Sequence, residues 1–239
     1  MGLTDPENSS PEDHARRVRE MFAQISPRYD LLNHVLSGNI DRKWRKVVAR
    51  RLQQLLPPDS TVLDVACGTG DLSIELFESA NVSVIGADFC RPMLALAARK
   101  APRICFVEAD ALRLPFPDAS FAGVTIAFGL RNLSSVEAGL RELRRVLKPG
   151  GWLAILEFSR PRRPGFRALV TAYSQRLLPW IGGWISGSRS AYAYLPDSVS
   201  RFPDQARLAA MMRAESLANV AFEDLTGGVA ALHIGQRPD

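Results

Sequence analysis

Hydrophobic residues in the central part of the chain fall into short runs, separated by stretches with helical spacing. The runs are TVLDVA (61–66), VSVIGAD (82–88), ICFVEAD (104–110), AGVTIAF (122–128) and WLAILEF (152–158). Such short apolar runs are typical of strands buried on both faces of a parallel sheet. The segments between them predict amphipathic helices, among them RPMLALAARK (91–100) and SVEAGLRELRRVLKPGG (135–151), the second closed by Pro149, Gly150 and Gly151. This alternation predicts right-handed crossovers and a doubly wound α/β sheet.

The two ends of the chain show other patterns. Residues 14–56 have apolar positions at helical spacing with one interruption, and residues 217–236 resemble a hairpin with Gly227 and Gly228 at its turn. We therefore predict a sheet of seven strands that is mostly parallel and ends in an antiparallel hairpin. The predicted organisation is a disordered tail (1–12) and a single domain (13–239) with a helical N-terminal cap (13–56) and a substrate-side insertion (160–203).

A glycine turn follows the first run and offers a place for a ligand. Gly68, Thr69 and Gly70 precede a helix, and Asp88 follows twenty positions after Gly68, where an acidic residue can bind both hydroxyls of a ribose. NAD fits this much, but the third glycine of the dinucleotide fingerprint is absent and a pyrophosphate would meet Asp64. The sulfonium and ammonium groups of S-adenosyl-L-methionine suit such carboxylates better. A glycine turn used only for packing is the structural alternative.

Polar residues also stand at other strand ends and in the predicted cap. Asp110 ends the third run and Ala111 follows it; the acid can accept from the exocyclic amine of an adenine, and the next backbone N–H can donate to its ring. Between the N-terminal helices lie Tyr29, His34 and Asp41, more polar chemistry than a linker needs. We expect these residues to cap the ligand, although His34 taken alone is more often an ordinary histidine.

Net charge and cysteine content limit the binding partners and metal sites that the sequence allows. The net charge is +5, but the basic residues are scattered and no nucleic-acid-binding motif is present. An anionic membrane surface therefore fits this charge as well as a nucleic acid does, and so does a solvated basic surface without a partner. The chain start lacks a secretory signal, so a cytoplasmic location is expected. The three cysteines have neither CxxC spacing nor an even number, which disfavours a disulfide framework and a metal site.

Residues 166–187 are about as long as a membrane span and rich in apolar residues, including Trp180 and Trp184. Arg167 and Arg176 argue against a transmembrane helix. Docking on a membrane surface, at the inner face of the plasma membrane, a groove for a lipid tail, and simple burial against the sheet are the three interpretations that fit.

Several segments together resemble one family. They are RYDLLNHVLSGNIDRKWR, VLDVACGTGD, AFGLRN, VLKPGG, AYAYLPDSVSRFP and LTGGVAALHIG, and the match runs from Phe22 to Gly235. These segments resemble the MenG/UbiE/Coq5 family, the C-methyltransferases of menaquinone and ubiquinone synthesis. The resemblance implies a class I (Rossmann-like) S-adenosylmethionine-dependent methyltransferase acting on a polyprenylated quinol. Ala127 departs from the serine that ubiquinone-pathway members often have, and Asp41 from a frequent histidine.

The resemblance also implies site residues and a chemistry. The family's cofactor contacts correspond to Thr69, Asp88, Asp110 and Ala111. Carbon methylation needs an electron-rich ring, and a cation near a ring hydroxyl favours its phenolate form. Arg131 is the candidate cation; its alternative role is to bind a strand-end carbonyl. The candidate proton acceptors are Tyr29, His34, Asp41 and Tyr194.

The most favoured substrate is demethylmenaquinol. Three rival functions are a nicotinamide oxidoreductase, a non-catalytic quinone or lipid carrier, and a methyltransferase for the benzoquinol precursor of ubiquinone or another aromatic acceptor. A homodimer is compatible with the sequence, as is a monomer.

Overall fold

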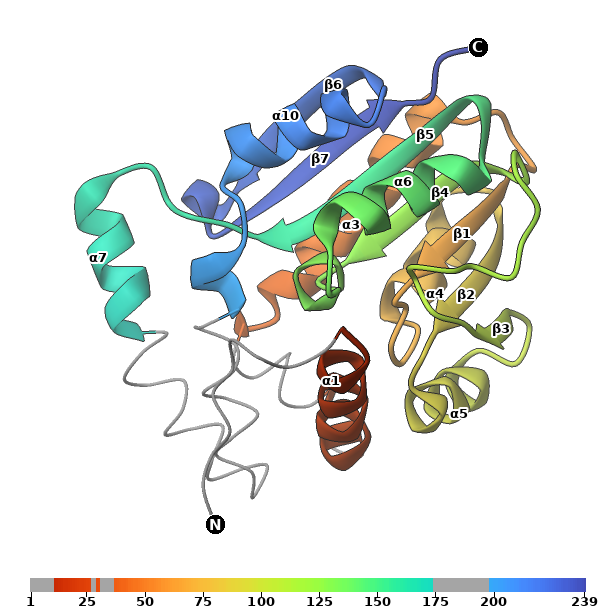
Figure 1. Ribbon diagram of the computed structural model, residues 1–239, viewed down its shortest axis with the longest axis horizontal. Coiled ribbons are helices and arrows are strands. Elements are labelled where there is room, and N and C mark those ends of the chain that lie inside the picture. The colour runs from red at the N-terminus through yellow and green to blue at the C-terminus, as the bar shows by residue number, and fades with distance from the viewer. Residues whose placement is uncertain (1–10, 27–28, 31–36, 174–197) are drawn as a thin grey trace.

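The computed structural model describes residues 11–26, 29–30, 37–173 and 198–239. A sheet of seven strands runs through them in the order β3-β2-β1-β4-β5-β7-β6 (Figure 1). The strands are β1 (Thr61–Val65), β2 (Ser83–Asp88), β3 (Cys105–Glu108), β4 (Phe121–Ala127), β5 (Leu147–Phe158), β6 (Ala218–Leu225) and β7 (Ala230–Gln236). Strands β1 to β5 are parallel, β7 is antiparallel to β5, and β6 is antiparallel to β7. The predicted mostly parallel sheet with a terminal hairpin is confirmed.

Helices cover both faces of this sheet. The helices of the described residues are α1 (Pro11–Ile25), α3 (Ile40–Leu55), α4 (Asp71–Ser79), α5 (Arg91–Lys100), α6 (Val136–Val146), α7 (Pro164–Ala172) and α10 (Gln205–Ala214), with 3-10 turns η3 (Leu130–Asn132) and η5 (Thr226–Gly228). On one face, Leu52 of α3 and Leu76 of α4 share a buried cluster with Val62 of β1. On the other, Leu143 of α6 and Met212 of α10 belong to a second cluster. Burying apolar side chains on both faces is what stabilises a parallel sheet.

The boundary between α6 and β5 differs from the sequence prediction. The helix expected to close at Pro149, Gly150 and Gly151 ends at Val146. The strand expected from Trp152 begins at once with Leu147, which pairs with Phe121 of β4. Leu147 already has extended backbone angles. The physical reason is Pro149, which cannot donate a helical hydrogen bond and disfavours helical angles in the residue before it. The predicted helix over residues 91–100 is confirmed as α5.

Two helices lie outside the layers that cover the sheet. Helix α1 contacts α5 and starts at Pro11, so it includes the last two residues of the stretch predicted as a tail. Helix α7 stands apart from the sheet in Figure 1, and none of its residues is buried. The apolar segment 166–187 is therefore not packed against the sheet in its described part, up to residue 173; Trp180 and Trp184 lie outside the described residues.

Candidate active site at the carboxyl ends of the strands

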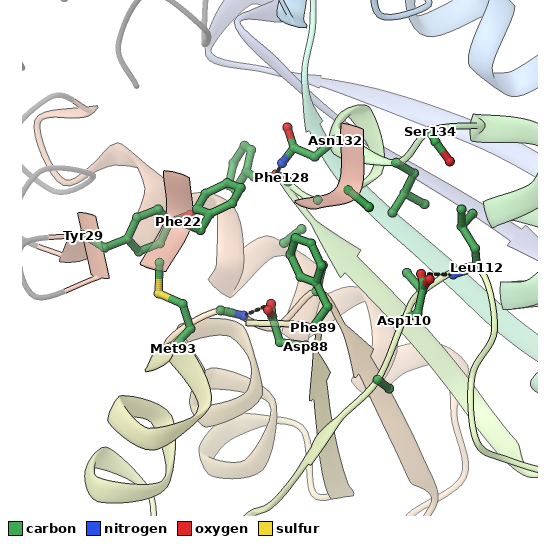
Figure 2. A pocket seen from close by; sticks show the side chains of 18 residues that line it. Phe22, Tyr29, Asp88, Phe89, Met93, Asp110, Leu112, Phe128, Asn132 and Ser134 are labelled. Carbon is green, nitrogen blue, oxygen red and sulfur yellow. Dashed lines mark hydrogen bonds between the residues drawn. The ribbon is translucent and has the colours of Figure 1, made fainter. Parts of the chain in front are cut away.

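A cavity of about 310 Å³ opens at the carboxyl ends of the parallel strands, beneath α1 (Figure 2). Open α/β sheets bind ligands at this edge. Its wall is formed by Ala15, Phe22, Tyr29, Ala66, Gly68, Asp88, Phe89, Met93, Ala109, Asp110, Ala111, Leu112, Ala127, Phe128, Gly129, Asn132, Leu133 and Ser134. The wall thus joins the ends of β1 to β4 to the N-terminal cap. It is mostly apolar, with two carboxylates.

The glycine turn between β1 and α4 has the backbone that its sequence predicts. Gly68 and Gly70 both have positive φ, at 57° and 83°. A Cβ on Gly70 would lie 3.1 Å from Ala97 and from the Phe106 ring, so packing as well as backbone angle requires glycine there. A Cβ on Gly68 would meet nothing nearer than 3.9 Å, so its backbone stays open to the cavity that it lines.

Asp88 ends β2 and joins the glycine turn to the cavity wall. Its Oδ2 accepts a hydrogen bond from the N–H of Gly68 at 2.8 Å, and its Oδ1 accepts one from Cys90 at 2.8 Å. Burial raises the pKa of this carboxyl, and the two N–H donors oppose that rise. Each oxygen keeps acceptor capacity after these bonds. Asp88 can therefore accept two more hydrogen bonds from a diol in the cavity.

The third strand is shorter than predicted, and Asp110 lies beyond it. Strand β3 ends at Glu108, after which the N–H of Ala109 donates to the carbonyl of Asp88. The Asp110 carboxylate accepts from the N–H of Leu112 at 2.9 Å, a local turn that fixes its side chain. Asp110, Ala111 and Leu112 form one wall of the cavity, and Figure 2 shows Asp110 and Leu112 beside each other.

Thr69 connects the turn to the cap. Its hydroxyl, on a residue only 2% exposed, donates to Asp30 at 2.5 Å. Lys100, the last residue of α5, binds both Asp30 at 2.9 Å and Asp71 at 2.5 Å. These contacts hold Asp30 against the first turn of α4. The described structure therefore gives the Thr69 hydroxyl a protein partner, and its predicted cofactor contact stays a prediction.

Asp64, predicted beside the cofactor, is buried beneath the turn and does not line the cavity. Its carboxylate accepts hydrogen bonds from Ser73 at 2.6 Å and Thr125 at 2.7 Å. Burial raises its pKa to about 6, against the opposing effect of these two hydroxyls. Ser73 stands where a dinucleotide fingerprint has its third glycine, and its bond to Asp64 gives that side chain a structural role.

The candidate proton acceptors separate into three groups. Tyr29 lines the cavity, and its ring packs edge-on against that of Phe22 in α1, with the ring centroids 5.9 Å apart. Asp41 is 4% exposed at the start of α3, where it binds Arg45 and accepts from Ser37, away from the cavity wall. His34 and Tyr194 lie outside the described residues.

Arg131 lies in η3, just past β4, with its guanidinium buried behind the cavity wall. Its side chain is 7% exposed, and Nη1 binds Glu157 at 2.8 Å and the carbonyl of Phe128 at 2.5 Å. The contact with Phe128 fits the alternative role predicted for it, a partner of a strand-end carbonyl. Its guanidinium also lies 5.4 Å from the Phe158 ring centroid. Its Nε is buried without a hydrogen-bond partner.

Two parts of the site were not predicted from the sequence. The first is an aromatic wall of Phe22, Phe89 and Phe128, whose rings face the cavity in Figure 2. The second is Glu157 near the end of β5, a fully buried carboxylate whose pKa is raised by burial and lowered again by Arg131. Glu157 is the last residue but one of an apolar run and so lies near a strand's carboxyl end, as Asp88 does; the same signal could have identified it.

Neither a metal-binding cluster nor a membrane-spanning helix is present in the described part of the chain. No group of three histidine, cysteine or acidic side chains there is arranged to hold a metal ion. No helix there is both long and apolar enough to cross a membrane.

The strand order, the glycine turn after β1 and the cavity at the carboxyl edge define a Rossmann-like class I methyltransferase. A solved structure of this class, a SAM-dependent methyltransferase from Thermotoga maritima, superposes with a TM-score of 0.64 at 15% identity. The superposition covers 91% of this chain and 99% of that one. This likeness establishes the fold.

Sequence comparison gives the family. Residues 10–237 match the model of the ubiE/COQ5 methyltransferase family, so the chain belongs to that family and is a methyltransferase. A demethylmenaquinone methyltransferase from Thermus thermophilus is 50% identical, over 91% of this chain and 100% of that protein. The ubiquinone/menaquinone biosynthesis C-methyltransferase UbiE of Geotalea uraniireducens is 42% identical, over 94% of this chain and 98% of that protein.

Proposed function

We propose that this enzyme transfers the methyl group of S-adenosylmethionine to a ring carbon of demethylmenaquinol. The observation that carries the proposal is the 50% identity to a protein named demethylmenaquinone methyltransferase, over the whole length of that protein. The site is consistent with it, because an apolar cavity with carboxylates at two strand ends suits both an aromatic ring and a nucleoside.

The residues of the cavity fit the cofactor. S-adenosylmethionine supplies an electrophilic methyl group on a sulfonium. We assign its ribose to Asp88, whose two oxygens retain acceptor capacity, and its adenine to Asp110 and Ala111. Gly68 is the member of the glycine turn whose backbone faces the cavity. The volume of about 310 Å³ lies at the lower end of the usual range for small-molecule sites.

We assign the activation of the quinol ring to Tyr29 and Arg131, which are not among the residues assigned to the cofactor. A quinol hydroxyl that loses its proton makes the ring carbon nucleophilic. Arg131, behind Phe128, is proposed to stabilise the resulting negative charge. We propose that Tyr29, or a water molecule beside it, accepts the proton, because Tyr29 lines the cavity and Asp41 does not.

A benzoquinol of ubiquinone synthesis is the second candidate substrate, since a 42% identical relative carries both pathways in its name. Incubating the enzyme with labelled S-adenosylmethionine and either demethylmenaquinol or the benzoquinol precursor separates the two. We expect label in the lipid extract with demethylmenaquinol at the higher rate. A higher rate with the benzoquinol would reverse the substrate assignment, and label with neither would contradict the proposal.

We further propose that α7 contacts an anionic membrane surface at the inner face of the plasma membrane, where a polyprenylated quinol resides. Leu169 is 66% exposed and Tyr173 is 36% exposed, the two large exposed hydrophobic side chains within the described residues. Arg163 and Arg167, both exposed, stand at the start of and within the same helix. Exposed apolar residues beside basic ones are typical of an interfacial element.

Arg167→Gln and Leu169→Gln are expected to weaken sedimentation of the enzyme with anionic liposomes. Each basic residue near such a surface contributes about 1 kcal/mol, or roughly fivefold in partitioning, and this part is screened by salt. The matched control is Arg207→Gln, an exposed arginine on α10. Turnover of a quinol without its tail should be unchanged in all three variants. Sedimentation of both α7 variants like the parent enzyme would exclude α7 as the contact.

A further inference from the structure

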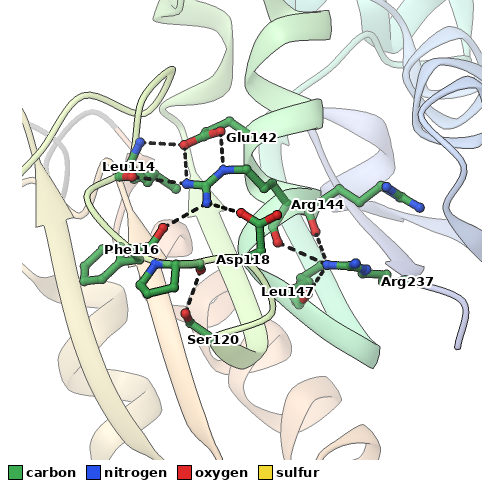
Figure 3. A network of polar contacts seen from close by, with 10 residues as sticks. Leu114, Phe116, Asp118, Ser120, Glu142, Arg144, Leu147 and Arg237 are labelled. Carbon is green, nitrogen blue, oxygen red and sulfur yellow. Dashed lines mark hydrogen bonds and ion pairs between the residues drawn. The ribbon is translucent and has the colours of Figure 1, made fainter.

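The cavity wall made by Asp110, Ala111 and Leu112 continues into a loop that has no regular secondary structure up to β4. This loop is nevertheless tied to α6 at two points. The N–H of Leu114 donates to Glu142 at 2.7 Å, and the carbonyls of Leu114 and Phe116 accept from Arg145 at 3.1 Å and 2.9 Å (Figure 3). The first of these points is only two residues beyond Leu112.

All three nitrogens of the Arg145 guanidinium donate hydrogen bonds in this contact between the loop and α6. Besides the two carbonyls, it binds both oxygens of Glu142, at 2.7 Å and 2.9 Å, and Asp118 at 2.6 Å. These five hydrogen bonds account for all five N–H donors of an arginine. The hydrogen bonds to Glu142 and Asp118 raise the pKa of Arg145, and the hydrogen bonds from Arg145 lower the pKa of Glu142. The pair therefore stays ionised.

The helix that carries the pair is fixed as well. Arg237, after β7, donates to the carbonyl of Leu147 at 2.6 Å and to that of Arg145 at 3.1 Å (Figure 3). Leu140 and Leu143 of α6 are fully buried in the core. A rigid helix therefore holds one end of the loop, and the sheet holds the other through the bond from Ala109 to Asp88.

We propose that Arg145 and Glu142 are positioning residues that set the nucleobase specificity of the cofactor site, by fixing the wall of Asp110, Ala111 and Leu112. The inference rests on the proposed function, in which the adenine lies against that wall. Because neither residue lines the cavity, both act through the loop backbone. Losing them leaves Asp88 and the aromatic wall in place but lets the adenine wall shift.

The test compares Arg145→Met and Arg145→Lys with a matched control on the same helix. Arg141→Met serves as control, since Arg141 is 70% exposed and its ion pair with Glu215 at 3.0 Å does not involve the loop. Calorimetry measures binding of S-adenosylhomocysteine and of its inosine counterpart, which lacks the exocyclic amine. Methyl-transfer kinetics give KM for the cofactor and kcat.

For Arg145→Met we expect about tenfold weaker binding of S-adenosylhomocysteine, with discrimination against the inosine counterpart reduced by a similar factor. KM should rise while kcat at saturating cofactor stays within about threefold, because the reacting groups are elsewhere. Arg145→Lys should recover part of the loss, since lysine keeps the charge but not the five-donor fork. Arg141→Met should resemble the parent.

Unchanged discrimination and KM in Arg145→Met would overturn the inference. If that variant does not fold, the result for Arg145→Lys decides: discrimination equal to the parent overturns the inference, and reduced discrimination supports it. The parent enzyme is measured first. Failure of the parent to bind S-adenosylhomocysteine would contradict the proposed function itself, whereas binding by the parent with no effect at Arg145 contradicts only the positioning role.

Discussion

Replacing Asp88 by alanine is expected to weaken S-adenosylmethionine binding by about tenfold or more, because hydrogen bonds to a charged, partly buried group contribute about 1.5–3 kcal/mol each. Asp88 is 6% exposed on the cavity wall and holds the N–H groups of Gly68 and Cys90. The change therefore removes the proposed ribose contact and also loosens the glycine turn. Isothermal titration calorimetry measures the affinity directly.

Two further variants separate these effects. Asp88→Asn keeps an acceptor oxygen and the shape of the side chain, so its loss should be smaller than that of Asp88→Ala. Glu108→Ala is the matched control, because Glu108 pairs with Asp88 across β2 and β3 but is exposed and outside the cavity wall. Affinity of Asp88→Ala equal to that of the parent, with a normal thermal unfolding curve, would remove Asp88 from the cofactor site.

Changing Arg131 to lysine is expected to lower turnover about a hundredfold, the usual size of a lost electrostatic contact to a developing anion, with cofactor affinity nearly unchanged. Lysine keeps the charge but lacks the planar guanidinium whose Nη1 binds both Glu157 and the Phe128 carbonyl. Glu157→Gln should lower turnover in the same direction. Because the two side chains touch, the double variant should lose less than the product of the single losses.

The control for this pair is Arg141→Lys, which weakens an exposed ion pair on α6 and should leave turnover unaltered. The decisive comparison is kcat against the cofactor dissociation constant. A large loss of cofactor affinity at full turnover would make Arg131 a cofactor ligand. Alanine is a poor substitute at this position, since an unpaired buried Glu157 destabilises the fold by about 3–5 kcal/mol.

Much of the fold could be predicted because it depends on local pattern. The apolar runs fixed the strands, and α5 at residues 91–100 was predicted with its observed bounds. The position of Asp88 at a strand end beside the cavity also follows from the pattern, since every parallel strand ends at one edge of the sheet. The start of β5 at Leu147 was not predicted, because Pro149 and the two glycines after it are typical of a helix end and not of a strand.

Other features depend on contacts between distant residues, which spacing does not reveal. Thr69 was predicted from its place in the turn, but its hydroxyl binds Asp30, which is 39 positions away in the sequence. Asp64 looked like a site residue, yet Ser73 and Thr125 enclose it beneath the turn. The bonds from Arg145 to the loop likewise join residues about 30 positions apart. A single sequence offers no signal for such pairings.

The most direct test of the central claim is the position of the transferred methyl group. The enzyme is incubated with S-adenosylmethionine carrying a carbon-13 methyl group and with demethylmenaquinol, and the lipid product is examined by NMR. The proposed function predicts a labelled methyl bonded to a ring carbon of the naphthoquinol, as in menaquinol. A labelled methyl on a ring oxygen, or transfer to no position of this acceptor, would contradict it.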